Sequence, residues 1–443
     1  MNIPASSKVG ALTILLCVAV LEARQDRVDN VGITAKGPPI VKLALPEFRP
    51  TTSGDRADKL AKVFNDTLWA DLDFSGNIEL SSRSFYPTGV FAVPGDIKVE
   101  DWTAPGVGAK YIAYGSLSIT ATAITATGRL RDLGAQQDSF GSNFPGSGDE
   151  DAARLVAHNL ADRILVELGF GRSIFRTQIS FVSNRSGAKE IYMMEYDGTG
   201  QHALTANGSI SITPSWSPAD DRIAYTVWRP GPQVAITSAI GARHSFTQVT
   251  GVANSTPSWS GDGKSIVYSS RRDGNYEIYR ADADGRNPRR LTSSPGIDIS
   301  PVFNPATGRS IAFVSDRSGS QQIYTMNDDG TDVQRITDEG GDAENPAYSP
   351  DGSMIAFAWQ KPRSGAFDIF IYDTVRRRFI QLTSNAANNE RPTWAPDGKH
   401  IAFQSNRSGT TQIYSMTLDA KKLIQLTNRG SNEGPTWSGY PTR

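Results

Sequence analysis

The sequence predicts an all-β, six-bladed β-propeller in its C-terminal part, preceded by a small α/β domain. One pattern recurs between Ile179 and Thr427: an aromatic strand, a polar turn, an Ile-containing strand, an Arg-Ser-Gly turn and an Ile-Tyr strand. Successive repeats end 45, 42, 45, 46 and 44 residues apart, at Thr205, Thr250, Thr292, Thr337, Thr383 and Thr427. Such a period, built from short strands and tight turns, is typical of propeller blades.

Composition agrees with a chain of many turns and argues against some classes of partner. The 443 residues include 41 Gly and 25 Pro, and this length predicts about two domains. The formal net charge is −1, so we expect neither nucleic acid nor an anionic membrane surface as the main partner. Beyond the N-terminus no apolar stretch is long enough to cross a bilayer, and we do not expect an integral membrane protein.

The N-terminus, residues 1–23, is typical of an export signal. Lys8 precedes the apolar run Ala11–Leu21, which is too short to span a membrane comfortably and resembles the apolar core of a signal peptide. Cleavage after Ala19 and cleavage after Ala23 both remain open. We therefore expect a mature protein that is soluble outside the cytoplasm.

The single cysteine, Cys17, lies inside the segment that we expect to be removed. The mature protein would then contain no disulfide, cysteine nucleophile or thiolate metal site. A lipoprotein anchored through Cys17 is an alternative, which the bulky residues Leu15 and Leu16 disfavour.

A polar N-terminal arm is expected at residues 24–38, followed by the α/β domain at 39–172. The expected elements of this domain are strands at Ile40–Leu45, Asn77–Leu80 and Tyr111–Arg131, helices at Gly54–Leu72 and 150–168, and a Gly/Ser-rich loop at Gly134–Gly148. The helices follow from apolar residues at helical spacing, and the strands follow from alternation of large and small residues.

The propeller is expected at residues 173–443, and the phase of its repeat predicts how the ring closes. The first set of three strands, 179–205, has no aromatic strand ahead of it, and the last aromatic strand, Pro435–Trp437, has no set after it. We expect the C-terminal strand 435–438 to complete the first blade, because this arrangement leaves no blade edge unpaired.

The sequence contains no recognisable catalytic constellation. The four histidines, His158, His202, His244 and His400, share no common spacing, and a metal site needs convergent ligands. The strings Asp282–Gly285 and Asp328–Gly330 recur at one point of the repeat and are interpreted as hairpin turns rather than calcium loops. We expect no enzyme activity, no metal and no cofactor, while a propeller hydrolase or lyase and a glycan-binding envelope module remain alternatives.

The loops that link successive blades lie nearest the propeller axis and form the candidate binding surface. They carry the acidic residues Asp298, Asp342, Glu344, Glu390 and Glu433. The Arg-Ser-Gly turns lie further out and carry Arg185, Arg272, Arg317, Arg363 and Arg407. A mouth that is acidic inside and basic outside suits a folded partner of complementary charge. The alternative is that both sets are solvated turn residues.

The residues predicted to bind a partner at the mouth come from these linking loops and the strands that follow them. They are Ala253, Asn254, Asp298, Ile299, Asp342, Glu344, Asn389, Glu390, Arg391 and Glu433.

Four segments of the repeat and its flanks are distinctive: Pro392–Gly398, Ser349–Gly352, the junction Phe175–Ile179 and the ending Gly434–Ser438. Through these segments the chain resembles the TolB family of periplasmic proteins from Gram-negative bacteria, whose propeller carries a similar motif. The order of signal peptide, arm, small α/β domain and six-bladed ring is similar to that of the family over essentially the full length.

This resemblance implies a non-enzymatic scaffold of the Tol-Pal system, located in the periplasm. Such a scaffold binds the peptidoglycan-associated lipoprotein Pal at the propeller mouth and TolA through the N-terminal arm, and it serves outer-membrane integrity and cell division. The arm residues implied in binding TolA are Arg24, Asp26, Arg27 and Val28. Outer-membrane proteins are further candidate partners, and the protein is expected to be a monomer without cofactors.

Overall fold

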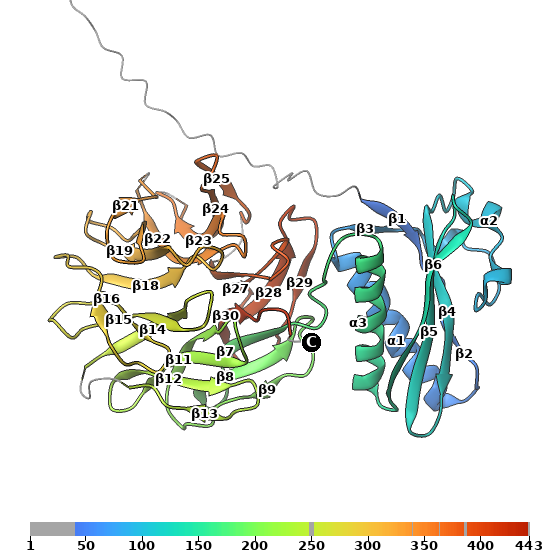
Figure 1. Ribbon diagram of the computed structural model, residues 1–443, viewed down its shortest axis with the longest axis horizontal. Coiled ribbons are helices and arrows are strands. Elements are labelled where there is room, and N and C mark those ends of the chain that lie inside the picture. Colours follow the sequence, from blue (N-terminus) through green and yellow to red (C-terminus); the bar gives the residue numbers. More distant parts are fainter. Residues whose placement is uncertain (1–39, 248–251, 339, 363, 385–387, 442–443) are drawn as a thin grey trace, which may run out of the picture.

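The chain folds into a small α/β domain followed by a six-bladed β-propeller (Figure 1), and the predicted fold class is confirmed. The computed structural model describes residues 40–247, 252–338, 340–362, 364–384 and 388–441. The predicted signal peptide, the arm with Arg24, Asp26, Arg27 and Val28, and Arg363 lie outside the described residues. Within the described part, no helix combines the length and the apolar character needed to cross a membrane.

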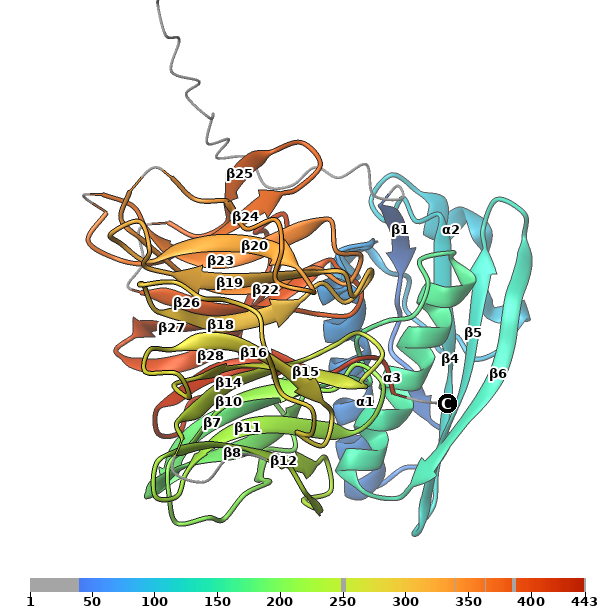
Figure 2. The ribbon, with the colours of Figure 1, turned by 60° about the vertical axis from the view of Figure 1, so that its left-hand side comes forward.

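The α/β domain consists of one mixed sheet with two long helices on the face toward the propeller (Figures 1 and 2). Its strands are β1 (Val41–Ala44), β2 (Arg49–Pro50), β3 (Ile78–Leu80), β4 (Tyr111–Ile119), β5 (Ala123–Asp132) and β6 (Gln137–Ser147). Its helices are α1 (Asp55–Phe74), α2 (Val99–Thr103) and α3 (Glu150–Glu167), with short 3-10 turns at Arg83–Phe85 and Pro94–Asp96. The strand order is β3-β1-β4-β5-β6, and β2 also pairs with β4.

The helices at 54–72 and 150–168 are confirmed by α1 and α3. Apolar side chains at helical spacing on α1, including Leu60, Phe64 and Leu68, are buried against the sheet and α3. Helix α3 begins at an N-cap, where the Asp149 carboxylate accepts a hydrogen bond from the Ala152 amide at 2.7 Å.

The prediction of a loop at Gly134–Gly148 is wrong, because most of this segment forms the edge strand β6. Its outward side chains face solvent, so the strand lacks the apolar alternation that would have identified it. A Cβ at Gly146 would lie 2.7 Å from Val156 Cγ2, and one at Gly128 would lie 2.6 Å from Leu160 Cδ1. Glycines therefore stand where α3 packs directly on β5 and β6.

Each propeller blade is a four-stranded antiparallel sheet. Blade 1 contains β30 (Asn432–Trp437), β7 (Gln178–Ser186), β8 (Ala188–Glu195) and β9 (His202–Ala203); blade 2 contains β10 (Ser211–Trp216), β11 (Arg222–Trp228), β12 (Pro232–Ser238) and β13 (Arg243–His244). Blade 3 contains β14 (Asn254–Trp259), β15 (Ser265–Ser270), β16 (Glu277–Asp282) and β17 (Arg289–Arg290); blade 4 contains β18 (Asp298–Phe303), β19 (Ser310–Ser315), β20 (Gln322–Asn327) and β21 (Gln334–Arg335). Blade 5 contains β22 (Asp342–Tyr348), β23 (Met354–Gln360), β24 (Asp368–Asp373) and β25 (Arg378–Gln381); blade 6 contains β26 (Asn389–Trp394), β27 (His400–Ser408), β28 (Thr410–Thr417) and β29 (Leu423–Gln425).

Adjacent blades pack through the large residues of their second strands. Ile311 and Phe313 on β19 are fully buried, and they share a core with Val267 and Ile278 of blade 3. The same alternation recurs in blade 6, where Ile401 and Phe403 are also fully buried. This repeated burial is the main apolar contribution to the stability of the ring.

The two ends of the propeller sequence meet in blade 1. Strand β30 pairs with β7 through Glu433 opposite Val182 and Trp437 opposite Ile179. The Trp437 indole Nε1 also donates a hydrogen bond to Thr177 Oγ1 at 2.8 Å. The last strand therefore occupies the innermost position of the first blade.

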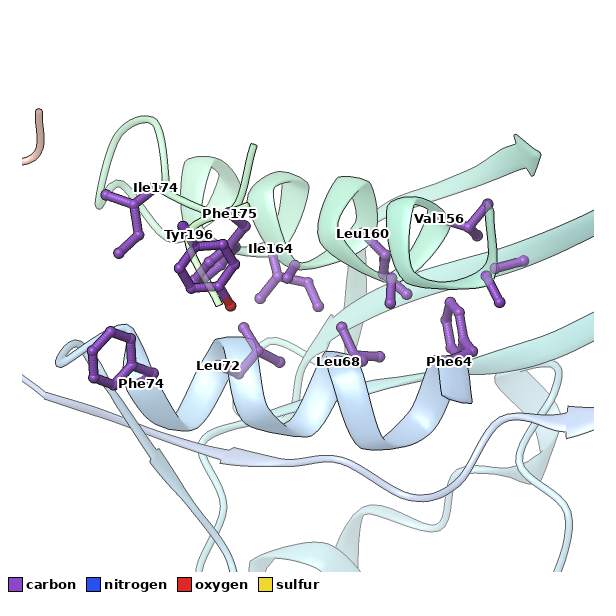
Figure 3. Close-up of a cluster of buried hydrophobic side chains, with 14 of the residues drawn as sticks. Phe64, Leu68, Leu72, Phe74, Val156, Leu160, Ile164, Ile174, Phe175 and Tyr196 are labelled. Carbon is purple, nitrogen blue, oxygen red and sulfur yellow. The ribbon is translucent and has the colours of Figure 1, made fainter. Parts of the chain in front are cut away.

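One apolar core joins the α/β domain to the propeller (Figure 3). Leu72 and Phe74 of α1 and Ile164 of α3 belong to this core together with Phe175 and Tyr196 of the propeller side. Because this core is continuous, the two domains pack against each other directly and are not joined by a flexible linker alone.

Buried polar groups add specific contacts to this interface. Asp71 of α1 is fully buried, accepts a hydrogen bond from the Tyr196 hydroxyl, and lies 2.8 Å from His158 Nδ1 of α3. His400 of blade 6 contacts the Asp397 carboxylate through Nδ1 at 2.7 Å and the Phe74 carbonyl through Nε2 at 2.8 Å. Both neighbours of His400 are acceptors, so the doubly protonated imidazolium fits this position best.

Deleting residues 434–443 is expected to abolish cooperative thermal unfolding. The deletion removes most of β30, exposes the edge of β7 and takes Trp437 out of the shared core. A truncated protein with an unchanged thermal midpoint would contradict the closure. As a graded control, Trp437→Phe retains an aromatic ring but loses the hydrogen bond to Thr177 and some core volume, and should cost about 1–3 kcal/mol while unfolding stays cooperative.

The stability of the protein is expected to fall as the pH rises above about 6.5, the ordinary pKa of histidine. Burial alone would lower the pKa of His400, but the Asp397 carboxylate and the Phe74 carbonyl outweigh it and raise that pKa. The resulting stabilisation is complete below the unfolded-state pKa and is lost as the pH passes the higher folded-state pKa, with a slope of up to about 1.4 kcal/mol per pH unit.

Chemical denaturation between pH 6 and 8.5 measures this slope. His400→Gln should flatten it without removing it, because the pKa of His158 is also raised by Asp71 against the effect of burial. An identical slope in the variant and the wild type would show that His400 does not titrate as described.

Candidate partner-binding mouth of the propeller

The two faces of the propeller are occupied differently. Tyr196 and Lys422, in turns between third and fourth strands, and His400, at the start of a second strand, all contact the α/β domain; Lys422 Nζ lies 2.6 Å from the Asp73 carboxylate. Because strand direction alternates within a blade, the loops between blades and the turns from second to third strands lie at the opposite face. We call this opposite face the mouth.

The innermost strands reach the mouth through one repeated local structure. Near its start, each of these strands shifts its register against the second strand of the blade, and a proline lies within the shifted segment. The residue before the proline has a φ between 50° and 58° in every blade: Thr213, Thr256, Ser300, Asn345, Arg391 and Gly434. These bulges turn the strand starts toward the axis, where hydroxyl groups and proline rings line a cavity of about 210 Å³.

Three of the residues predicted to bind a partner lie below the surface of the mouth. Asn254, Asp298 and Asn389 begin their strands and are at most 2% exposed. Asp298 accepts a hydrogen bond from Arg317 Nη2 at 2.7 Å, and Asn389 accepts one from Arg407 Nη2 at the same distance. Asp298 and Asn389 therefore have a supporting position, in which each holds an arginine of its own blade, while Asn254 donates a hydrogen bond to the Val252 carbonyl at 3.0 Å.

Three of the turn arginines, Arg185, Arg317 and Arg407, lie against aromatic rings of their own blades rather than projecting as the basic outer ring that the sequence suggested. The guanidinium of Arg317 lies 5.4 Å from the Phe313 ring centroid and 5.1 Å from that of Tyr324. Arg407 lies in the same way over the rings of Phe403 and Tyr414 in blade 6. Arg185 lies over the rings of Phe181 and Tyr192 in blade 1. Each arginine is thus held between a strand-start residue and an aromatic pair, which fixes the rim of the mouth.

These contacts between arginines and strand-start residues were not predicted from the sequence, although the repeat contains a pattern that indicates them. Arginine follows a serine by two residues in these repeats, and an Asp or Asn stands 19 residues earlier for Arg317 and 18 residues earlier for Arg407. The recurrence of both residues at nearly the same spacing indicated a contact within the blade.

One position of each innermost strand, two residues before its proline, lies at the mouth end of the strand. In blade order these residues are Glu433, Ile212, Ser255, Ile299, Glu344 and Glu390. Four of the predicted residues, Ile299, Glu344, Glu390 and Glu433, therefore occupy one structural position. Ala253 is half-buried at the rim just before β14, and Asp342 accepts a hydrogen bond from the Gln321 amide at 3.1 Å.

The three glutamates at this position have different surroundings. Glu390 accepts a hydrogen bond from Gln404 Nε2 at 2.7 Å, and Glu433 pairs with Lys189. Glu344 has neither a hydrogen bond nor an ion pair among the described residues. Burial raises the pKa of Glu344, the charge of Glu390 raises it further, and Arg391 opposes both effects.

The geometry offers binding contacts rather than a reaction centre. The described part of the chain contains no group of three or more His, Cys, Asp or Glu side chains placed to hold a metal ion. What the mouth does present is a fixed ring of carboxylates, hydroxyl groups and aliphatic side chains, an arrangement suited to recognising a protein surface.

Comparison with known proteins places the propeller in a family. The family described as the TolB beta propeller domain matches residues 167–360 and 340–440. The Protein TolB homolog of Chlorobium chlorochromatii (strain CaD3) is 32% identical over 305 residues, which cover 66% of this chain and 66% of that relative. The Tol-Pal system protein TolB of Bordetella parapertussis is 34% identical over 304 residues, which cover 67% of this chain and 65% of that relative. The similarity thus spans about two thirds of the length of these relatives.

The similarity in fold extends over both domains. The crystal structure of TolB from Acinetobacter baumannii matches 93% of this chain and 99% of that chain, with a TM-score of 0.77 and 23% identity. At this identity the match shows a shared fold.

Arg317→Met is expected to destabilise the protein by about 2–3 kcal/mol, because it leaves the fully buried Asp298 carboxylate without its cation. The expected loss is moderate because the Arg317 side chain is 24% exposed. Asp298→Asn is the matched control: Asn389 and Asn432 accept from their arginines in the same way, so this variant should lose about 1 kcal/mol or less.

The double variant should recover part of the Arg317→Met loss, since no charge is then left buried alone. Urea denaturation measures all three variants. Equal losses in Arg317→Met and in the double variant would contradict this role of the ion pair.

Proposed function

Because this chain belongs to the TolB family, we propose that it is a non-enzymatic periplasmic scaffold of the Tol-Pal system. In this proposal the mouth of the propeller binds the lipoprotein Pal, and the arm at residues 24–38 binds TolA. The relatives support membership of the system, since several are named Tol-Pal system protein TolB. Service to outer-membrane integrity and cell division belongs to the same proposal.

The placement of the mouth is the observation that carries the proposal for Pal. The α/β domain occupies one face of the ring, while the fixed rim of charged and aliphatic side chains lies at the other. Glu344, Glu390 and Glu433 stand at this rim, and a rigid surface loses little conformational entropy on binding. The buried residues Asn254, Asp298 and Asn389 contribute by holding the rim in place.

The two alternative functions receive less support. Propeller hydrolases and lyases are not among the names of the curated relatives described above. A glycan-binding module would stack sugars on several surface aromatic rings. Trp259 and Trp394, at the ends of the innermost strands, are 4% and 6% exposed and pack between blades, which leaves Trp228, 46% exposed, as the exposed tryptophan among the described residues of the mouth.

Reversing two charges at the mouth, Glu344→Lys with Glu390→Lys, is expected to weaken binding of the Pal protein from the same organism. Loss of attraction and new repulsion should raise Kd by about tenfold or more at low salt, and less at high salt. Isothermal titration calorimetry with the lipid-free Pal domain measures the change.

Deletion of residues 24–36 provides the control for two separate surfaces. The deleted protein should retain its affinity for Pal and lose capture of TolA from an envelope extract. Unchanged Pal affinity in the charge-reversed variant at low salt would contradict the proposal for the mouth. TolA capture that survives the deletion would contradict the proposal for the arm.

A further inference from the structure

The rim of the mouth is divided into two halves of different chemistry. At the position shared by the innermost strands, blades 5, 6 and 1 carry Glu344, Glu390 and Glu433 in succession. The remaining three blades carry Ile212, Ser255 and Ile299 there. The residue two places earlier follows the same division, with Asp342, Asn388 and Ser431 in the first half and Ile210, Ala253 and Ile297 in the second.

The second half exposes more apolar surface than its packing requires. Ile210, Trp228 and Ile297 are 44%, 46% and 44% exposed, whereas Ile212 and Ile299 are partly covered by neighbouring blades. Trp228 and Ile210 are adjacent, because the Trp228 amide donates a hydrogen bond to the Ile210 carbonyl at 2.9 Å. Ile297 lies two blades further along the same rim, and exposed apolar side chains on a fixed surface mark a site of interaction.

In the first half, one carboxylate lacks a partner. Glu390 is hydrogen-bonded by Gln404 and Glu433 is paired with Lys189, but Glu344 has no hydrogen bond or ion pair within the described structure. Arg391 lowers the pKa of Glu344 through its charge but forms no ion pair with it in the described structure. A half-buried carboxylate without a partner is costly in the free protein, so an incoming cation would relieve that cost.

We propose that the mouth recognises a two-part protein surface, in which a cationic side chain pairs with Glu344 and apolar side chains pack against Ile210 and Trp228 of blade 2 and Ile297 of blade 4. The inference rests on the proposed function and specifies the chemistry of the Pal surface that the mouth accepts. The division of the rim also sets a single orientation for the partner, because rotation about the propeller axis would bring its cation over the apolar half.

Salt dependence separates the contributions of the two halves. Attraction between Glu344 and a cation at the rim is screened by salt, whereas apolar burial is not weakened by it. Binding of the lipid-free Pal domain from the same organism should therefore be measured by surface plasmon resonance at 50 mM and 300 mM salt. The variants are Glu344→Gln for the acidic half, and Trp228→Ser and Ile297→Ser for the apolar half.

The opposite face of the propeller offers matched controls. Ile240→Ser removes an isoleucine that is 87% exposed in a turn between third and fourth strands, and Asp329→Asn removes one negative charge from the equivalent turn of blade 4. Both controls should bind Pal like the wild type. Thermal midpoints of all five variants show whether each has folded.

The expected outcome is a different signature for each half. Glu344→Gln should weaken binding at 50 mM salt about fivefold or more and have a smaller effect at 300 mM. Trp228→Ser and Ile297→Ser should raise the dissociation rate about tenfold at both salt concentrations.

Two results would overturn the proposal in distinguishable ways. Wild-type binding to Pal, combined with wild-type behaviour of the two apolar variants or a salt-independent effect of Glu344→Gln, overturns the two-part surface and leaves the proposed function standing. Failure of the wild-type protein to bind the Pal domain overturns the proposed function and this inference with it.

Discussion

The pairing of β30 with β7 is the contact on which the rest of the structure depends. It joins the two ends of the propeller sequence in one blade, so that every blade has a neighbour on both sides. The same blade carries the domain interface, because Trp437, Ile179 and Tyr196 share one core with the helices of the α/β domain. Closure of the ring and docking of the domain are thus stabilised by the same side chains.

A closed ring explains why the mouth is a fixed surface. Each innermost strand packs between the innermost strands of the two adjacent blades, and a bulge bends its start toward the axis. Arginines such as Arg317 and Arg407 then tie the strand starts to the aromatic pairs of their blades. The side chains that remain for recognition, including Glu344 and Trp228, stand on this support, so the division of the rim is preserved when a partner approaches.

Much of the fold could be predicted from the sequence, because blade period and strand alternation are local patterns that recur. The position of the last strand followed from the phase of the repeat. Strand β6 was missed because its solvent-facing side chains show no apolar alternation, and because a glycine such as Gly146, which the close packing of α3 requires, looks like a loop residue in the sequence. At the mouth, the acidic residues were found, but the burial of Asp298 was not, because its contact with Arg317 forms only when the blade is complete.

The central claim is that the mouth, opposite the α/β domain, is the face that binds Pal. Hydrogen-deuterium exchange of this protein with and without the Pal domain tests it most directly. The account predicts slower exchange at the strand starts around residues 210–213, 297–300, 342–345 and 388–391, with no change in the turns at 328–331 and 373–377. Protection confined to those turns, or to the α/β domain, would contradict it.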